Sequence, residues 1–167
     1  MTTSCIINNF NYGHFCQEAI RSALAQTVPF KEIIVIDDGS TDDSVEKLRE
    51  QFSAEPRVKI ITQKNGGMLS THNRGFLEST GDALFFLDAD DLYVPQRVQT
   101  VLQIMERDPR IGLVFSPFTV FGDTSGTMYT RKSRSSRMRR LRQDQQIPSQ
   151  DLEFGPTFND AYYHRNW

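Results

Sequence analysis

The chain has 167 residues, of which 38% are hydrophobic and 24% charged, which gives room for about one domain around one sizeable core. Its net charge of −2 is uneven, because residues 1–123 carry 11 Lys or Arg against 17 Asp or Glu, whereas residues 124–167 carry 8 against 4. No apolar run comes near the roughly 20 residues that cross a bilayer, and the N-terminus lacks a signal-peptide pattern. Composition therefore argues against a membrane-spanning or multidomain chain. We expect a cytoplasmic protein and leave contact with a membrane surface open.

The first predicted unit is a strand, a loop and a helix. Ser4–Ile7 is a short β-prone run, and it breaks into Asn8–Gly13, whose amides and glycine favour a turn. Helical spacing then relates five apolar residues: Phe15, Ala19, Ile20, Ala23 and Leu24. The two cysteines, Cys5 in the strand and Cys16 in the helix, have neither metal-site spacing nor a disulfide framework, so we interpret them as buried apolar groups in a reducing compartment.

The second unit begins with a strand over Glu32–Ile36 that ends on two acids, Asp37 and Asp38. Ser40 or Thr41 is the predicted cap of the helix that follows. The inner face of that helix is predicted to carry Val45, Leu48 and Phe52.

Three more strands follow at similar intervals. Val58–Ile61 is the third, and after Lys64–Gly67 a weaker helical pattern includes Leu69 and Phe76 and ends at Gly81. Ala83–Leu87 is the fourth, and it stops on Asp88, Asp90 and Asp91.

The next helix starts with Pro95 in its first turn and has an apolar stripe of Val98, Val101, Leu102 and Met105. Ile111–Phe115 is the predicted fifth strand.

Strands alternating with helices predict an α/β fold with a doubly wound, mostly parallel sheet. The predicted domain covers residues 1–122. Residues 123–167 are predicted to form an irregular basic loop and an aromatic C-terminal segment, packed on the same domain or partly disordered.

Two acidic strand ends are the strongest chemical signal in the sequence. Parallel strands bring successive carboxyl ends to one edge, so Asp37 and Asp38 should lie near Asp88, Asp90 and Asp91. Crowded carboxylates repel one another unless a cation or hydrogen-bond donors offset their charge. Mg²⁺ or Mn²⁺ together with a polyphosphate fits better than zinc, because no His/Cys set is present. The alternative is that these acids only cap helices and make polar loops.

Four other features have both a functional and a plainer interpretation. Gly66 and Gly67 could offer backbone N–H groups to an anion, or form an ordinary turn. Phe10 could stack on a nucleobase or simply pack. His72 is predicted to be an ordinary helix histidine rather than a catalytic one. The basic run Arg131–Arg142 is predicted to be a solvated loop rather than a nucleic-acid site, so no nucleic-acid partner is expected.

Five motifs in order resemble family 2 glycosyltransferases of the GT-A fold, a Rossmann-like architecture. The resemblance covers residues 3 to about 122, and its motifs are Ser4–Tyr12, Val35–Asp42, Lys64–Gly67, Asn73–Gly75 and Phe86–Asp91. It implies an inverting transferase of polysaccharide biosynthesis that uses Mg²⁺ or Mn²⁺. The implied partners are a nucleoside-diphosphate sugar, with UDP as its nucleotide, and a saccharide or lipid-linked acceptor.

The resemblance also implies roles for individual residues. The donor would be bound by Asn8, Phe10, Asn11, Asp37, Asp38, Lys64, Gly66, Asn73 and Asp88. The metal would be held by Asp88, Asp90 and Asp91.

Three features depart from the family pattern. Asn8 and Asn9 replace a Pro and a Thr or Val, and His72 stands where Arg is common. No Glu-Asp pair follows Asp91, so Asp151 and Asp160 are the candidates for the general base. Two other hypotheses therefore stay open: a truncated or regulatory domain that binds a sugar nucleotide without transfer, and a nucleic-acid-binding module that uses Arg131–Arg142.

Overall fold

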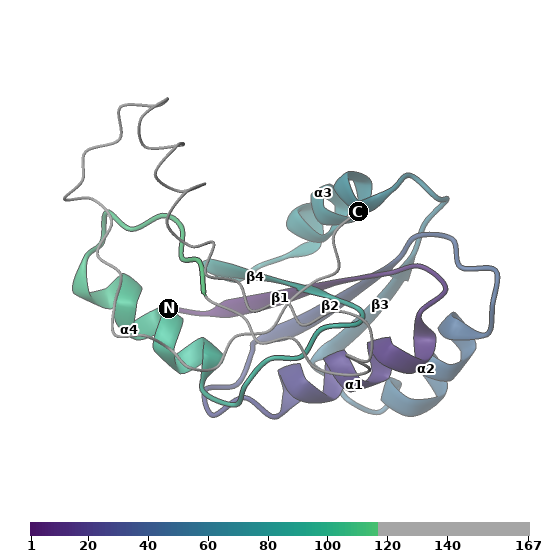
Figure 1. Ribbon diagram of the computed structural model, residues 1–167, viewed down its shortest axis with the longest axis horizontal. Coiled ribbons are helices and arrows are strands. Elements are labelled where there is room, and N and C mark those ends of the chain that lie inside the picture. Colours follow the sequence, from purple (N-terminus) through teal and green to yellow (C-terminus); the bar gives the residue numbers. More distant parts are fainter. Residues whose placement is uncertain (117–167) are drawn as a thin grey trace, which may run out of the picture.

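The computed structural model describes residues 1–116 and shows one parallel four-stranded sheet with helices on both faces (Figure 1). In chain order the elements are β1 (Thr3–Asn9), α1 (Gly13–Leu24), β2 (Glu32–Asp37), α2 (Ser44–Phe52), β3 (Val58–Thr62), α3 (Met68–Glu78), β4 (Ala83–Asp88) and α4 (Arg97–Arg107). The predicted α/β class and parallel sheet are confirmed. Among these helices none is long and apolar enough to cross a bilayer.

The strand order is β3-β2-β1-β4, with all neighbours parallel. The chain therefore builds outward from β1 through β2 to β3 and then crosses to the other side of β1 to form β4. This reversal makes the crevice between the carboxyl ends of β1 and β4 the topological switch point, the place where open α/β sheets bind ligands.

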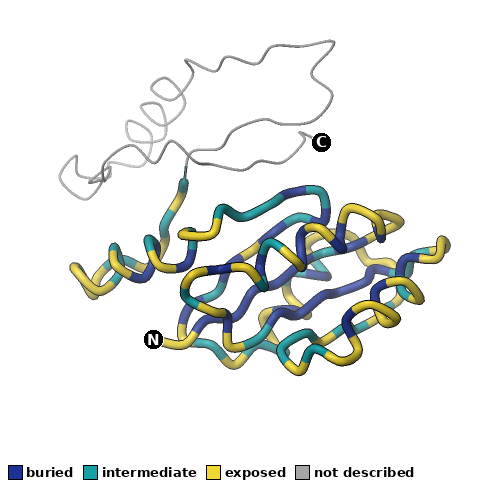
Figure 2. Tube along the Cα trace, turned by 90° about the horizontal axis from the view of Figure 1, so that it is seen from below, coloured by how far each residue is buried: buried dark blue, intermediate teal, exposed yellow. Residues whose placement is uncertain are grey.

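Helices cover the two faces unequally. α1 and α2 pack together under the sheet, and α3 lies above β1 and β2 on the opposite face (Figure 1). The main core joins the inner faces of α1, α2 and α4 to the strands, and Figure 2 shows these buried stretches in dark blue. α4 is tied to the end of α1 by Gln26, whose side chain donates to the Val94 carbonyl and accepts from the Val98 N–H.

Several sequence-based details were wrong. Phe15 is 51% exposed, because α1 begins at Gly13 and turns Cys16 and Gln17 inward instead. Ser40 does not cap α2, because its hydroxyl donates to Asp37 and the helix begins only at Ser44.

The predicted fifth strand over Ile111–Phe115 is also absent, since residues 111–116 belong to no strand. Within the described residues no further strand pairs with the outer edge of β4, and Phe115 is 78% exposed. An apolar run indicates that a segment can be a strand, but a strand also needs a partner to receive its hydrogen bonds.

Glu32 joins three segments at the amino-terminal edge of the sheet. One of its carboxylate oxygens accepts from the Ser4 hydroxyl at 2.7 Å and from the Thr80 N–H and hydroxyl at 2.6 and 2.8 Å. Burial raises the pKa of Glu32, but these hydrogen bonds and the charge of Lys31 together lower it more, so the net pKa is below its ordinary value.

We expect Glu32→Ala to cost about 1 kcal/mol at pH 7, the net value typical of such hydrogen bonds in a partly exposed group. A carboxyl with a lowered folded-state pKa stabilises the fold above its unfolded pKa of about 4.3, and loses this effect as pH falls through the folded value. Urea unfolding should therefore show a stability difference between wild type and variant that shrinks below about pH 4. A difference that stayed constant from pH 7 to pH 3 would contradict this prediction.

Candidate nucleotide and metal site at the carboxyl edge

Strand register places polar side chains around the switch point. Asn8 of β1 lies opposite Asp88 of β4, and Asn9 lies opposite Asp37 of β2. The carboxyl ends of β2 and β4 therefore flank β1 at one edge, which is the juxtaposition that the sequence predicted. Asp38 follows directly, and its N–H donates to the Asn9 carbonyl at 2.8 Å.

The residues after β4 form a tight acidic turn. The Asp91 N–H donates to the Asp88 carbonyl at 3.1 Å, and Ala89 and Asp90 make the turn between them. The Asp91 side chain is only 8% exposed. Burial, followed by the negative charges of Asp88 and Asp90, raises the pKa of Asp91 to about 7. This is the shift expected when like charges share a poorly solvated site.

Three buried acceptor oxygens near the ends of β1 and β4 lack donors. They are Oδ1 of Asn8, Asn9 and Asp91, none of which has a hydrogen-bond partner among the described residues. Oxygen acceptors without donors suit a hard divalent cation. Residues 1–116 contain no group of three His, Cys, Asp or Glu side chains placed to hold a metal ion. The acidic turn is thus not a closed cage, and it suits a cation that one or two carboxylates share with phosphate and water.

The Asp37 carboxylate accepts hydrogen bonds from β1 and from the loop after β2. It accepts from Asn9 Nδ2 at 2.7 Å and from the Ser40 N–H and hydroxyl at 2.9 and 2.5 Å. Ser40 Oγ in turn accepts from the Asn11 N–H at 2.8 Å, while Asn11 Oδ1 accepts from the Thr41 N–H at the same distance. These bonds join the loop after β1 to the loop after β2.

The Asp38 carboxylate accepts hydrogen bonds from the loop after β3. It accepts from Gln63 Nε2 and from the backbone N–H groups of Gly66 and Gly67. Neither Gln63 nor Ser40 was predicted as a site residue. Gln63 meets Asp38 across 25 residues of sequence, whereas Ser40 lies three residues from Asp37 and was predicted as a helix cap instead.

The remaining predicted donor-binding residues lie on the loops of this edge and on α3. Phe10 is half exposed after β1, next to Asn11, whose φ of 56° is the left-handed turn conformation that asparagine tolerates. Lys64 and Gly66 are exposed in the loop between β3 and α3. Asn73 is exposed on α3.

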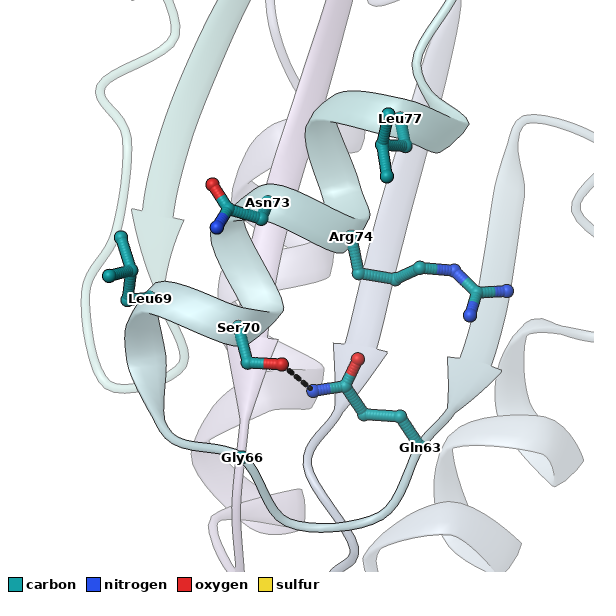
Figure 3. Close-up of a pocket in the computed structure, with 7 residues that line it drawn as sticks. All are labelled: Gln63, Gly66, Leu69, Ser70, Asn73, Arg74 and Leu77. Carbon is teal, nitrogen blue, oxygen red and sulfur yellow. Dashed lines mark hydrogen bonds between the residues drawn. The ribbon is translucent and has the colours of Figure 1, made fainter.

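Asn73 and Gly66 line a shallow hollow of about 540 Å³ on the outer side of α3 (Figure 3). Gln63 reaches across it to Ser70 with a hydrogen bond of 3.1 Å. None of the predicted aspartates lines this hollow. Asn73 therefore shares this hollow with Gly66 and not with the predicted aspartates.

Tyr93 and Arg97 support the acidic turn and were not predicted as site residues. The Tyr93 hydroxyl donates to the Phe86 carbonyl at 2.7 Å, and the Arg97 guanidinium lies 5.7 Å from the Tyr93 ring centre. Burial lowers the pKa of Arg97, and Arg97 Nε has no partner among the described residues. His72 packs its ring edgewise on Phe86, two residues before Asp88.

Other predicted features lie outside the described residues. These are the two general-base candidates Asp151 and Asp160 and the basic run Arg131–Arg142. Their roles stay predictions.

Sequence comparison connects this geometry to known proteins. The family model described as "Glycosyl transferase family 2" matches residues 4–162. An uncharacterized glycosyltransferase of Nostoc sp. is 39% identical over 117 residues, covering 68% of this chain and 36% of the relative. The chondroitin synthase of Escherichia coli is 34% identical, covering 68% of this chain and 16% of the relative. The chain thus spans about a third or less of the length of these relatives.

Solved structures share the fold. The mannosyltransferase PcManGT from Pyrobaculum calidifontis, in complex with GDP-Man and Mn²⁺, superposes with a TM-score of 0.63 and 20% identity over 70% of this chain and 35% of its own. TarS of S. aureus, in complex with UDP-GlcNAc, gives a TM-score of 0.58 and 24% identity over 64% of this chain and 32% of its own. At these identities the likeness demonstrates a shared architecture.

Proposed function

The chain belongs to glycosyl transferase family 2, and from this premise we propose that it transfers a sugar from a nucleoside-diphosphate sugar to a saccharide or lipid-linked acceptor, with inversion at the anomeric carbon. One observation carries the proposal. Asn8 at the end of β1 lies opposite Asp88 at the end of β4, the turn after β4 holds Asp90 and Asp91, and Oδ1 of Asn8 and Oδ1 of Asp91 are buried without a hydrogen-bond donor among the described residues. A donor whose diphosphate is bound with a cation would satisfy those oxygens.

We assign the nucleotide to the loops on the β1 and β2 side of this edge. Phe10 is exposed enough to stack on the base, and Asn11 fixes the loop that carries it. Lys64 is an exposed cation on the loop after β3 and suits the negative diphosphate. UDP is the nucleotide we favour, since TarS, which has this architecture, was solved in complex with UDP-GlcNAc.

The acidic turn is the proposed cation site. Asp90, with Asp88 or Asp91, would hold Mg²⁺ or Mn²⁺, which when bound neutralises charge that develops on the departing diphosphate. PcManGT was solved with Mn²⁺ together with GDP-Man, which supports a divalent ion in this architecture. Tyr93 holds the turn against the end of β4 through its bond to the Phe86 carbonyl.

The reaction needs a nucleophile and a base. The acceptor hydroxyl oxygen would bond to the anomeric carbon from the face opposite the diphosphate, and the carbon–oxygen bond to the diphosphate would break. A carboxylate would take the hydroxyl proton. Asp151 and Asp160 are the sequence-based candidates for that carboxylate, and both lie outside the described residues.

A thermal-unfolding screen tests the donor assignment. UDP-GlcNAc, GDP-mannose and their parent nucleotides are added with MnCl₂ or with EDTA. A ligand that binds only the folded state, at one hundred times its Kd, adds about 2.7 kcal/mol of stability. We expect at least one nucleotide sugar to raise the Tm with MnCl₂ and not with EDTA. No Tm shift with any donor at millimolar concentration would contradict the proposed function, and binding without transfer to any acceptor would favour the binding-only hypothesis.

A further inference from the structure

One face of β4 is apolar, yet the described residues leave it uncovered. The strand, Ala83–Asp88, is apolar except for its last residue, which is typical of a parallel strand that is covered on both faces. Phe85 and Leu87 are buried in the main core. Phe86 points to the opposite face and is 49% exposed. Residues 1–116 therefore cover only one side of this strand.

The open face is the one on which α3 lies. Phe86 pairs with Ile6 of β1, and Ile6 faces Gly75 of α3, so Phe86 and Ile6 point to the same side of the sheet. α3 packs mainly on β1 and β2. It meets β4 at its margin, where the His72 ring lies edgewise to the Phe86 ring with the ring centres 5.0 Å apart. Beyond this contact the face of β4 stays exposed.

The margin of α3 beside β4 is apolar as well. Met68 and Leu69 lie one helical turn before His72, and both are exposed, Leu69 by 74%. Figure 3 shows the Leu69 side chain on the β4 side of α3, whereas Arg74 points to the β3 side. We call Met68, Leu69, His72 and Phe86 the α3–β4 surface. An exposed apolar surface of this kind usually marks a contact with another segment or another protein.

The chain itself carries a segment that suits this surface. The family match continues beyond the described residues to residue 162, so the same domain extends past Ser116. Residues 154–167 contain five aromatic side chains: Phe154, Phe158, Tyr162, Tyr163 and Trp167. At roughly 3.3 Å per extended residue, the chain between Ser116 and Phe154 is long enough to reach any side of the domain. A tethered segment also has a higher effective concentration than a second copy of the chain in dilute solution.

We propose that residues 154–167 pack on the α3–β4 surface of the same chain. The aromatic rings would cover Leu69 and Phe86 and remove apolar area of both partners from water. Packing here would bury β4 on both faces, as its sequence favours. The inference depends on neither the donor nor the metal of the proposed function.

Photo-crosslinking in the full chain tests where the segment lies. p-Benzoylphenylalanine replaces Leu69 in one variant and Phe15 in the control, because Phe15 is also exposed but lies on α1, at the opposite face of the sheet. We expect position 69, and not position 15, to be joined to peptides from residues 154–167. A mixture of isotopically light and heavy protein separates crosslinks within one chain from crosslinks between two copies.

Trp167 gives a second readout, because it is the only tryptophan of the chain. Leu69→Glu places a charge on the α3–β4 surface, and Leu77→Glu is the matched control at a similarly exposed leucine near the other end of α3. A buried unpaired charge is costly, so Leu69→Glu should release the segment. We expect a shift of Trp167 emission to longer wavelength and stronger quenching by acrylamide in Leu69→Glu, and neither change in Leu77→Glu.

Far-UV circular dichroism checks that both glutamate variants keep the fold, which we expect because both leucines are exposed. Crosslinks from position 69 that reach only a second copy would overturn the proposal in favour of self-association. Absence of crosslinks to residues 154–167, or Trp167 emission and quenching that stay at wild-type values in Leu69→Glu, would also overturn it.

Discussion

Replacing Asp90 with alanine is expected to lower metal-dependent turnover of the nucleotide sugar by about a thousandfold, the scale seen when one group that stabilises leaving-group charge is removed. Asp90 is a partly exposed carboxylate in the turn after β4, next to the donor-free oxygen of Asp91. Its loss would remove a cation ligand without touching the hydrogen bonds of Asp37 and Asp38. The decrease should therefore appear both in kcat and in the MnCl₂-dependent binding of the donor.

Release of the nucleoside diphosphate from the donor, measured at increasing MnCl₂, is the assay for this prediction. Glu106→Gln is the matched control, because Glu106 is an exposed acid on α4 outside the site. The control should keep wild-type turnover and the wild-type Tm. Full turnover of Asp90→Ala at saturating MnCl₂ would remove Asp90 from the proposed cation site.

The positions of the acids could be predicted because they depend on local patterns and on one rule of topology. Apolar runs ending on Asp37 and Asp88 defined two strand ends, and parallel pairing brought them to the same edge. The apolar stripe of α4 could also be predicted from the sequence, since Val98, Val101 and Leu102 are buried at the expected spacing.

The contacts of the acids could not be predicted from the same patterns. Asp38 bonds to Gly66 and Gly67 about 28 residues away, and this pairing depends on how the loop after β3 folds over the end of β2. Sequence spacing shows that two loops share an edge, but not which donor reaches which oxygen. The same limit explains why Tyr93 and Arg97 were missed, because their importance arises from burial beside the acidic turn.

The fifth strand illustrates a related limit. Ile111–Phe115 has the composition of a strand, and composition reports only that burial on a sheet would be favourable. Whether such a segment pairs depends on a neighbour that residues 1–116 do not supply.

Gly75→Val is expected to destabilise the fold by about 3 kcal/mol, which is at the upper end for an overpacked core. A Cβ at Gly75 would lie 2.3 Å from Ile6 Cγ2 and 3.1 Å from Ile6 Cγ1. Ile6 is fully buried in β1, which pairs with strands on both sides, so the helix must move instead of the strand. Valine has a better helix propensity than glycine, but this offsets the loss of stability by less than about 0.5 kcal/mol.

Phe76→Val is the matched control for this prediction, because it introduces the same residue one position along α3 at a side chain that is 60% exposed. Its stability should stay within about 0.5 kcal/mol of wild type, whereas Gly75→Val should lower the urea midpoint and reduce the Tm by roughly 10 °C. Displacement of α3 would also move the Gly67 end of the loop that Asp38 holds, so UDP binding should weaken in Gly75→Val and not in Phe76→Val. Equal midpoints for the two variants would mean that the close approach of α3 to β1 does not restrict residue 75.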